Sequence, residues 1–383
     1  MNTDILLKLK GHQRPITNIL IDDTNNLIST SKDSKLIIWN NYNTSSIVNC
    51  SGAIWFVMAN SAKLFIGTAD GILSLYDYDG VLINSYTDCG PVRFIHFDKN
   101  SNTFYILSKK LLKKESVLSV LDSNFSKICD FEFEIEHNKG YYTEDNKIIC
   151  GGSDGTLRFL CFENNKLNLL KELELHKSEI TEIEEYEDNL ITSSYDCSLK
   201  ILNKDNLEIK SSFKHSTSIL SFSINKEKKV IAIGGGPDKM NIANTSDNRQ
   251  FDIVLINMLN GEKLFDINSK HFGPINSICF NENDNKIITG GEDGFIHIWD
   301  CGDRWLEKYT LKHMINECKN TEENLQEANT SLNNTRSGKE TKNKRRNLKK
   351  RIEKLKIRID DWNKQIAIFS VLHELDKFEN LKL

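Results

Sequence analysis

The sequence is poor in proline, in paired cysteines and in long apolar runs. Its 383 residues include four prolines and nine cysteines, and no two cysteines stand at C-x-x-C spacing. An odd cysteine count without that spacing argues against a disulfide framework and against a structural zinc site. No apolar run is long enough for a transmembrane helix, and the opening MNTDILLKLK lacks the apolar core of a signal peptide. We therefore expect a cytoplasmic protein with reduced thiols.

A large excess of charge of one sign is also missing. The net charge is −4, with 27% charged and 39% hydrophobic residues. This balance excludes a molecule that binds nucleic acid through its overall charge. The apolar content is high enough for a large core, which excludes wholesale disorder. The length alone allows two or three domains, unless internal repeats join them into one unit.

The strongest signal in the chain is an internal repeat. Residues 271–300, HFGPINSICFNENDNKIITGGEDGFIHIWD, contain a His, two apolar runs around a polar turn, an Asp in a tight turn, and a third run that ends in Trp-Asp. This order indicates three short strands joined by turns. The first unit repeats the order with Gly11-His12, Asp33 and Trp39.

The period of the repeat predicts the fold. Its turn aspartates, Asp33, Asp70, Asp154, Asp196 and Asp293, are separated by 37, 84, 42 and 97 residues, so each long gap holds one degenerate unit. Seven units of this period are typical of WD40 β-propeller blades. We predict an all-β, seven-bladed WD40 propeller over residues 1–302, with a C-terminal α-helical extension over 303–383. Because the seventh unit has three strands, residues 5–9 should complete it and close the ring.

The repeated His and Asp residues indicate a structural hydrogen-bond network within each blade. The pairs His12/Asp33, His176/Asp196 and His271/Asp293 have similar spacing, and a buried His–Asp pair joined by Ser/Thr and Trp fixes the turn of a blade. A catalytic triad is the alternative, but no nucleophile accompanies the pairs at a shared offset. We expect no catalytic residue, and a network made of His12, Asp33, Trp39, Asp70, Asp154, His176, Asp196, His271, Asp293 and Trp299.

Two units depart from the pattern. The third, around residues 89–137, carries KKLLKKES where the turn Asp should stand, and the sixth contains GGGPDKMNIANTSDNRQ at residues 234–250. Three glycines raise the question of a phosphate loop, but no Gly-Lys-Ser/Thr and no helical pattern follow them. We expect a polar insertion of the kind that contacts partners, and neither a cofactor nor a metal site.

After Asp300 the apolar period becomes helical. One seam runs through Leu311, Ile315, Cys318, Leu325 and Leu332, with Glu322 and Asn329 in the remaining positions. A second steps by four and three residues through Leu348, Ile352, Leu355, Ile359, Trp362, Ile366 and Phe369. These heptad spacings predict helices over 304–332 and 341–379, folded as an antiparallel hairpin.

The second predicted helix begins with a basic run. Residues 338–358 hold eleven Lys or Arg against two Glu, giving +9. The run is a solvated helix face, a partner for the acidic residues of the first helix, or an rRNA contact through phosphates. The residues considered for RNA contact are Lys344, Arg345, Arg346, Lys349, Lys350 and Arg351.

Three segments give the sequence a more specific resemblance. HFGPINSICF (271–280) with GGEDGFIHI (290–298), the triple-glycine stretch 234–246, and LKGHQRPIT (9–17) resemble the WD-repeat i subunit of eukaryotic translation initiation factor 3. The resemblance covers residues 5–330 and is weak in the second and third units. The family has a shorter tail, so the second predicted helix departs from its pattern.

The resemblance implies a non-catalytic scaffold in the initiation-factor assembly at the small ribosomal subunit. In this family the propeller holds a C-terminal helix of the b subunit along blades five and six and contacts the g subunit. No membrane and no small-molecule substrate are implied. The matching positions here are Glu187, Asp188, Ile201 and Asn203. The family often has an acidic residue where Asn203 stands, which weakens an ion pair with a basic helix. The alternative is that Ile201 is a core residue and Asn203 only ends a strand.

Two other functions remain open at this point. A related WD40 adaptor in RNP assembly or signalling, such as the kinase-receptor-associated propeller, should lack the combination of HFGPIN with the triple-glycine loop. An enzyme with a propeller active site needs a metal cluster, an activated nucleophile or a cofactor loop, and the sequence offers none. Identification of co-purifying proteins separates these functions, because initiation-factor subunits favour the scaffold and spliceosomal or assembly-chaperone proteins favour the adaptor.

Overall fold

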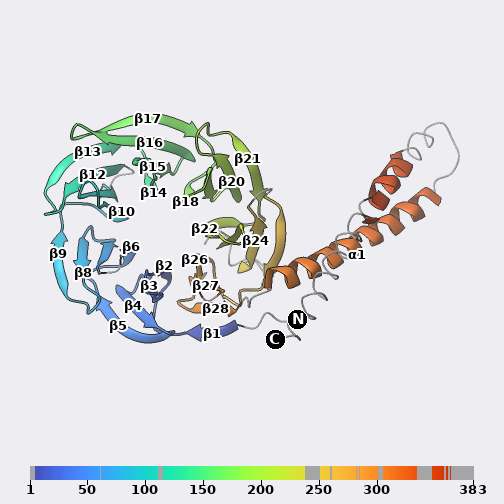
Figure 1. The fold of residues 1–383 in the computed structure, drawn as a ribbon, viewed down its shortest axis with the longest axis horizontal. Coiled ribbons are helices and arrows are strands. Elements are labelled where there is room, and N and C mark those ends of the chain that lie inside the picture. Colours follow the sequence, from blue (N-terminus) through green and yellow to red (C-terminus); the bar gives the residue numbers. More distant parts are fainter. Residues whose placement is uncertain are drawn as a thin grey trace, which may run out of the picture. The chain divides into compact units, whose positions relative to one another are not determined.

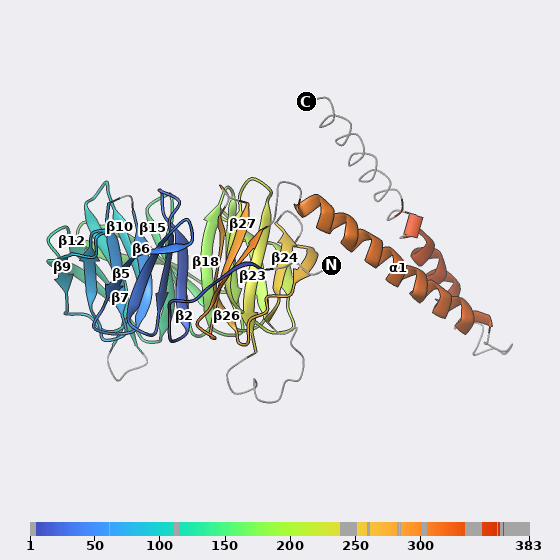
Figure 2. The same cartoon turned by 90° about the horizontal axis from the view of Figure 1, so that it is seen from below.

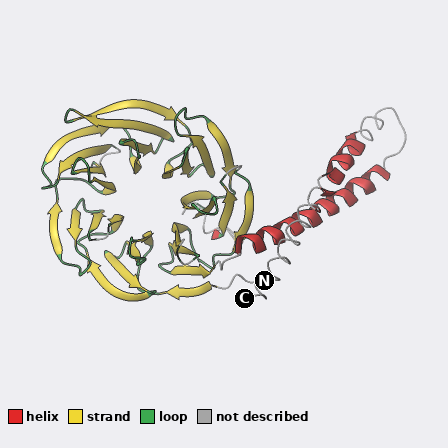
Figure 3. Ribbon diagram, in the orientation of Figure 1, coloured by secondary structure: helices red, strands yellow, loops and turns green. Residues whose placement is uncertain are grey.

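The structure is a computed structural model that describes residues 5–60, 62–110, 115–237, 251–258, 261–281, 283, 285–300, 305–333, 347–357, 359–360 and 363. The chain divides into two compact units, Met1–Asp300 and Cys301–Leu383. Figure 3 shows that strands make up the first unit and helices the second. Each unit is described by itself.

The described residues of the first unit form seven four-stranded antiparallel sheets, arranged as the blades of a ring (Figure 1). Viewed edge-on, the strands run across the thickness of the ring, and the turns gather on its two faces (Figure 2). The prediction of a seven-bladed propeller is therefore confirmed. The repeat predicted the fold correctly because each repeat unit forms one blade.

The strands of a blade follow one another outward from the centre of the ring (Figure 1). Blade one holds β2 (Ile16–Ile21), β3 (Leu27–Ser31), β4 (Lys35–Asn40) and β5 (Asn43–Asn49). Blade two holds β6 (Ile54–Ala59), β7 (Leu64–Thr68), β8 (Leu73–Tyr76) and β9 (Leu82–Tyr86). Blade three holds β10 (Val92–Asp98), β11 (Thr103–Lys109), β12 (Ser116–Asp122) and β13 (Lys127–Phe133). Blade four holds β14 (His137–Tyr142), β15 (Lys147–Gly152), β16 (Thr156–Glu163) and β17 (Lys166–Glu174).

The remaining three blades follow the same order. Blade five holds β18 (Ile180–Tyr186), β19 (Asn189–Ser194), β20 (Ser198–Asn203) and β21 (Ile209–Lys214). Blade six holds β22 (Ser218–Asn225), β23 (Val230–Gly236), β24 (Ile253–Asn257) and β25 (Lys263–Ile267). Blade seven takes β26 (Ile275–Asn281), β27 (Lys286–Gly291) and β28 (Ile296–Asp300) from the end of the ring and β1 (Ile5–Leu9) from the start of the chain.

Strand β1 joins the two ends of the propeller. It pairs antiparallel with β28, with Leu7 opposite Ile298 and Leu9 opposite Ile296. The Leu9 side chain is buried in the core cluster that also contains Trp39 of blade one. Blade seven thus gains its fourth strand and a hydrophobic contact with the next blade, which leaves no gap where the ring begins and ends.

Burial explains why the second strand of each blade reads as a continuous apolar or small-residue run. All residues of β3, β7 and β23 are buried, because neighbouring blades cover both faces of these strands, and side chains on both faces must then be apolar or small. The core clusters cross blade boundaries. Ile28 and Leu36 of blade one, for example, pack with Ile54 and Val57 of blade two.

Every blade carries a β-bulge in its inner strand and another where its outer strand pairs. The bulged inner residues all line the central channel, a cavity of about 820 Å³, and they are Thr17, Trp55, Arg93, Asn138, Thr181, Leu220 and Asn276. The bulged outer residues are Leu6, Ser45, Ile83, Ile128, Leu170, Lys210 and Leu264. Each bulge adds one unpaired residue and increases the local twist of its strand.

The triple glycine of blade six belongs to strand β23 and has a packing role. A Cβ atom on Gly235 would lie 2.0 Å from the Ser218 carbonyl oxygen, and one on Gly234 would lie 2.6 Å from the Ile275 side chain. The glycines therefore allow β22 and blade seven to approach β23 closely. Residues 238–250 of the polar insertion lie outside the described residues.

The second unit contains helix α1 (Trp305–Asn333) and a second helical segment at residues 347–357. The Cys318 thiol donates a hydrogen bond of 3.5 Å to the Asn363 side-chain oxygen, so the chain folds back on itself within this unit. The predicted limits of the second helix, at 341 and 379, lie outside the described residues.

The seam predicted for the first helix is wrong in part. Ile315, Glu322 and Asn329 are exposed, whereas Thr321 and Ala328 are buried together with Cys318. The burial steps by three and seven residues and still follows one helix face, but small side chains occupy it. Small residues allow two helices to approach closely, and a search for large apolar residues overlooks them.

Candidate functional site

In blade one the expected His–Asp pair forms a continuous buried hydrogen-bond chain. The Trp39 indole donates to the Ser29 hydroxyl at 2.8 Å, and this hydroxyl lies 2.9 Å from His12 Nε2. His12 Nδ1 lies 3.1 Å from both Asp33 carboxylate oxygens. Asp33 also accepts the Gln13 backbone N–H, at 2.9 Å. This chain of hydrogen bonds connects the loop before β2 to the turn between β3 and β4.

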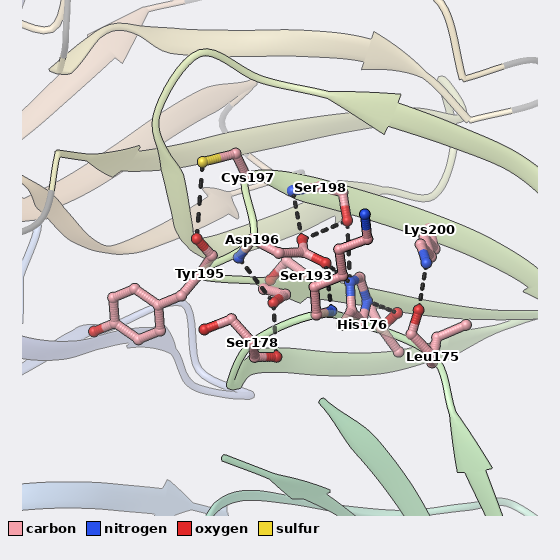
Figure 4. A network of polar contacts seen from close by, with 12 residues as sticks. Leu175, His176, Ser178, Ser193, Tyr195, Asp196, Cys197, Ser198 and Lys200 are labelled. Carbon is pink, nitrogen blue, oxygen red and sulfur yellow. Dashed lines mark hydrogen bonds and ion pairs between the residues drawn. The ribbon is translucent and has the colours of Figure 1, made fainter. Parts of the chain in front are cut away.

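Blade five contains a similar arrangement around His176 and Asp196 (Figure 4), with a threonine in place of the serine and a leucine in place of the tryptophan. His176 Nδ1 lies 3.1 Å from Asp196, and His176 Nε2 lies 2.9 Å from the Thr192 hydroxyl. Asp196 accepts the Ser198 hydroxyl at 2.5 Å and the Lys177 backbone N–H at 2.9 Å. The place of the tryptophan is taken by Leu202, which is fully buried.

Blade seven completes the set of three. His271 Nδ1 lies 3.0 Å from Asp293, and His271 Nε2 lies 2.9 Å from the Thr289 hydroxyl. The Trp299 indole donates to that hydroxyl at 3.3 Å. His271 also stacks on His297, with ring centres 4.0 Å apart.

The networks of blades one and five are consistent with a neutral histidine. Burial lowers the pKa of His12 and of His176, although the neighbouring aspartates oppose the shift. Burial alone would raise the pKa of Asp196, but hydrogen bonds from Ser198, Lys177 and His176 outweigh it and lower that pKa to about 2. A neutral His whose Nδ1–H donates to a carboxylate then accepts a hydroxyl proton at Nε2. Each hydroxyl is thus held inside its blade and faces no open site for a substrate.

The two other expected aspartates lie in equivalent turns with different partners. Hydrogen bonds from Thr68 and Ser51 outweigh the effect of burial and lower the pKa of Asp70. Gly52 stands close to this carboxylate, so that a Cβ atom there would lie 2.6 Å from Asp70 Oδ1. Asp154 pairs with Arg158 at 3.0 Å.

Sequence reasoning missed His137 and Arg158 in blade four. Arg158 Nη1 lies 3.1 Å from His137 Nε2. The Arg158 guanidinium therefore lies between the histidine and Asp154, and it replaces the direct His–Asp contact of blades one, five and seven. The available signal was the shortened spacing, because His137 precedes its aspartate by 17 residues and the other three pairs are separated by 20 to 22. In blade three, where the turn Asp is absent, Lys109 pairs with Glu136.

Basic and acidic side chains line the central channel in nearly equal number. Arg93 lies over the Trp55 ring at 3.6 Å, Lys139 pairs with Glu182 at 2.5 Å, and Lys32 pairs with Glu292 at 3.5 Å. Within the described part of the chain, no cluster of three or more His, Cys, Asp or Glu side chains is placed to hold a metal ion. The channel therefore has no large excess charge for a charged substrate.

The positions expected to bind a partner helix lie in blade five, but one of them is not on the surface. Ile201 is 2% exposed and belongs to the core shared with blade six, so its inclusion as a contact residue is corrected. Glu187 and Asp188 lie in the turn between β18 and β19, and Asn203 ends β20 opposite Asn189. The Asn203 side chain accepts the backbone N–H groups of the following turn.

Half of the expected RNA-contact residues can be placed. Lys349, Lys350 and Arg351 are exposed on the helical segment 347–357, whereas Lys344, Arg345 and Arg346 lie outside the described residues. No ion pair joins the three placed side chains to an acidic group among the residues that the structure describes. None of the described helices has the length and apolarity needed to span a membrane.

Comparisons with known proteins agree with this architecture. The family described as WD domain, G-beta repeat matches residues 3–40 and 263–300. The crystal structure of the WD40 β-propeller domain of Doa1 superposes with a TM-score of 0.63 at 16% identity, covering 79% of this chain and 98% of that one. That likeness concerns the fold.

Sequence relatives are more specific. Eukaryotic translation initiation factor 3 subunit I of Anopheles gambiae is 27% identical over 314 residues, which is 76% of this chain and 95% of the relative. The protein of that name from Saccharomyces cerevisiae (strain ATCC 204508 / S288c) is 24% identical over 351 residues, 84% of this chain and 99% of the relative. The resemblance to the i subunit is confirmed. These homologues support a role in translation initiation.

Buried histidines should make the stability of the propeller depend on pH. Burial lowers the pKa of His96, His137 and His297 to about 4, while unfolded histidines titrate near pH 6.5. Below that pH the unfolded chain binds more protons, so the free energy of unfolding should be constant above about pH 7 and fall between about pH 6.5 and 4.

The test is urea unfolding of the wild type and of His96→Phe at several pH values between 4.5 and 8. Phenylalanine keeps the stacking on Tyr142, whose ring centre lies 4.0 Å away, and removes one titrating group. The slope of unfolding free energy against pH should decrease by up to about 1.4 kcal/mol per pH unit. An identical slope in the variant would contradict the assignment.

Proposed function

We propose that this chain is a non-catalytic scaffold subunit of the eukaryotic translation initiation factor 3 complex. It would act in the cytoplasm at the small ribosomal subunit during initiation, and bind other subunits through its propeller. The observation that carries this proposal is the internal satisfaction of the three His–Asp networks. Their polar atoms are used to hold the blades, which leaves the surfaces of the ring as its functional parts.

The enzyme hypothesis has no comparable support. A catalytic Ser–His–Asp site needs a nucleophile that reaches a substrate, yet the hydroxyls next to His12, His176 and His271 are buried. The same arrangement occurs in three blades, which fits a repeated structural role. A buried network of this kind is costly to disturb because each unpaired member loses its hydrogen bonds without regaining water.

For the b subunit, we propose a contact at the rim of blade five formed by Glu187, Asp188 and Asn203. The Glu187 carboxylate is half exposed and lies 3.3 Å from Lys229 of blade six. The Asp188 backbone oxygen accepts hydrogen bonds from Lys204 and Lys210, which fixes the turn and leaves its carboxylate available. Ile209 at the start of β21 is 51% exposed and supplies the apolar contact that the buried Ile201 cannot.

For the g subunit we propose a separate contact on the same ring. For rRNA, we propose that the exposed Lys349, Lys350 and Arg351 reach backbone phosphates. The exposed acidic residues of α1, Glu322, Glu323 and Glu327, form no ion pair with them among the described residues. Basic side chains without such an ion pair can neutralise phosphates, and this releases the counterions bound to the RNA.

Charge reversal at the rim of blade five tests the scaffold proposal. The double variant Glu187→Lys, Asp188→Lys should bind the C-terminal region of the b subunit about tenfold more weakly, because a basic helix would meet like charges. Isothermal titration calorimetry with purified proteins measures the affinity. The matched control is Glu163→Lys, Glu174→Lys on blade four, where both glutamates are exposed.

The control variant should bind like the wild type. Equal affinities for all three proteins would contradict a contact at this rim. Failure of the wild type to bind the b subunit at all, and failure to co-purify with other initiation-factor subunits, would contradict the scaffold function itself.

Neutralising the basic helix tests the rRNA contact. The triple variant Lys349→Gln, Lys350→Gln, Arg351→Gln should lower the slope of log affinity against log salt by about 2, because each lost phosphate contact removes about 0.7 to 0.9. The measurement is binding to purified small ribosomal subunits over a salt series. A control with Lys166, Lys171 and Lys177 of the propeller changed to Gln should keep the slope, and an unchanged slope in the helix variant would remove the proposal.

A further inference from the structure

The outer strands of the blades are the open edges of the seven sheets, since no further described strand pairs with them. Open edges attract additional strands, and proteins commonly protect them with lysine. Five of the seven outer strands follow this rule, with Lys8 in β1, Lys127 in β13, Lys166 and Lys171 in β17, Lys210 and Lys214 in β21, and Lys263 in β25. Strand β5 has no lysine, but its sequence NTSSIVN is mostly polar.

Strand β9 of blade two is the exception. Val81 just before it is 59% exposed, and Leu82 and Ile83 within it are 51% and 49% exposed. The chain from residue 64 to residue 90 contains no Lys, Arg or Pro. Three consecutive aliphatic residues therefore stand on an edge that lacks the usual protection.

The bulge at Ile83 does not supply that protection. All seven outer strands carry a bulge at the equivalent place, including the five that also carry lysine. The bulge is thus a property of this fold, and the difference between β9 and the other strands lies in its side chains.

Acidic residues stand at both ends of β9. Asp77 and Asp79 lie in the turn before it and Asp88 lies after it, with Asp79 and Asp88 exposed. Asp88 pairs with Lys127 at 3.6 Å, and this lysine also pairs with Asp130 at 3.1 Å. A second copy of this chain would bring its own aspartates against these, in either strand direction, and like charges repel.

We propose that β9 binds an extended segment of a partner protein, which adds to blade two as a fifth strand. Its backbone would supply the main-chain hydrogen bonds, as in other strand additions. Aliphatic side chains of the segment would cover Leu82 and Ile83, and basic residues at both of its ends would meet Asp79 and Asp88. This surface is remote in sequence from the rim of blade five, and the proposal does not depend on a role in initiation.

The probe is a synthetic peptide of sequence KKVTVTVKK, labelled for fluorescence anisotropy. It should bind the full chain with a dissociation constant in the range of about 1 to 100 μM. The peptide EEVTVTVEE should bind at least about tenfold more weakly because its ends repel the aspartates. KKVTPTVKK should also bind weakly, since proline removes a main-chain donor.

Two matched variants locate the site. Leu82→Lys adds the missing edge lysine and should weaken binding of KKVTVTVKK by about tenfold. Leu170→Lys is the control, because Leu170 is equally exposed, at 51%, on outer strand β17, which already has lysines, and it should bind like the wild type. Hydrogen–deuterium exchange should show protection by the peptide at residues 81–86.

Three results would overturn the proposal. The first is no binding of KKVTVTVKK at about 1 mM. The second is equal loss of binding in both variants, which would indicate contact elsewhere. The third is concentration-dependent dimerisation of the wild type that Leu82→Lys abolishes, since a second copy would then occupy the edge.

Discussion

The propeller depends on a polar chain that is buried within its blades. In blades one and seven an indole, a hydroxyl, an imidazole and a carboxylate follow one another at hydrogen-bond distance. In blade one a neutral histidine suits this order, and burial lowers the pKa of His12. Because the carboxylate also accepts backbone N–H groups, one side chain fixes both the loop and the turn of its blade. A buried carboxylate left without these donors would be strongly destabilising.

The sequence allowed the fold to be predicted because this polar chain recurs with a fixed spacing. The seven blades and their order follow from the positions of the turn aspartates, and that prediction is confirmed. The spacing did not predict the network of blade four, where Arg158 lies between His137 and Asp154 in place of a direct His–Asp contact. The resemblance to the i subunit implied a contact position at Ile201, but it does not distinguish a buried strand residue from an exposed one, and the alternative of a core residue is correct. In the tail, burial of Thr321 and Ala328 depends on close helix packing, which an apolar pattern does not record.

The function that we propose rests on the charged and apolar side chains that stay exposed on the surface of the propeller. The His–Asp networks of blades one, five and seven are paired within their blades, so we look to the surfaces for what is particular to this chain. Two surfaces stand out on physical grounds, the acidic rim of blade five and the lysine-free edge of blade two. The first is the contact that we propose for the b subunit, and the second follows from comparison of the seven outer strands with one another.

A double-mutant cycle between His176 and Asp196 tests the central claim most directly. The unfolding free energies of His176→Ala, Asp196→Ala and the double variant give the coupling between the two side chains. Our account predicts a coupling of about 1 to 3 kcal/mol, with binding of the b subunit retained in every variant that folds. A coupling near zero, or full stability with loss of binding, would show that the pair serves a site and not the blade.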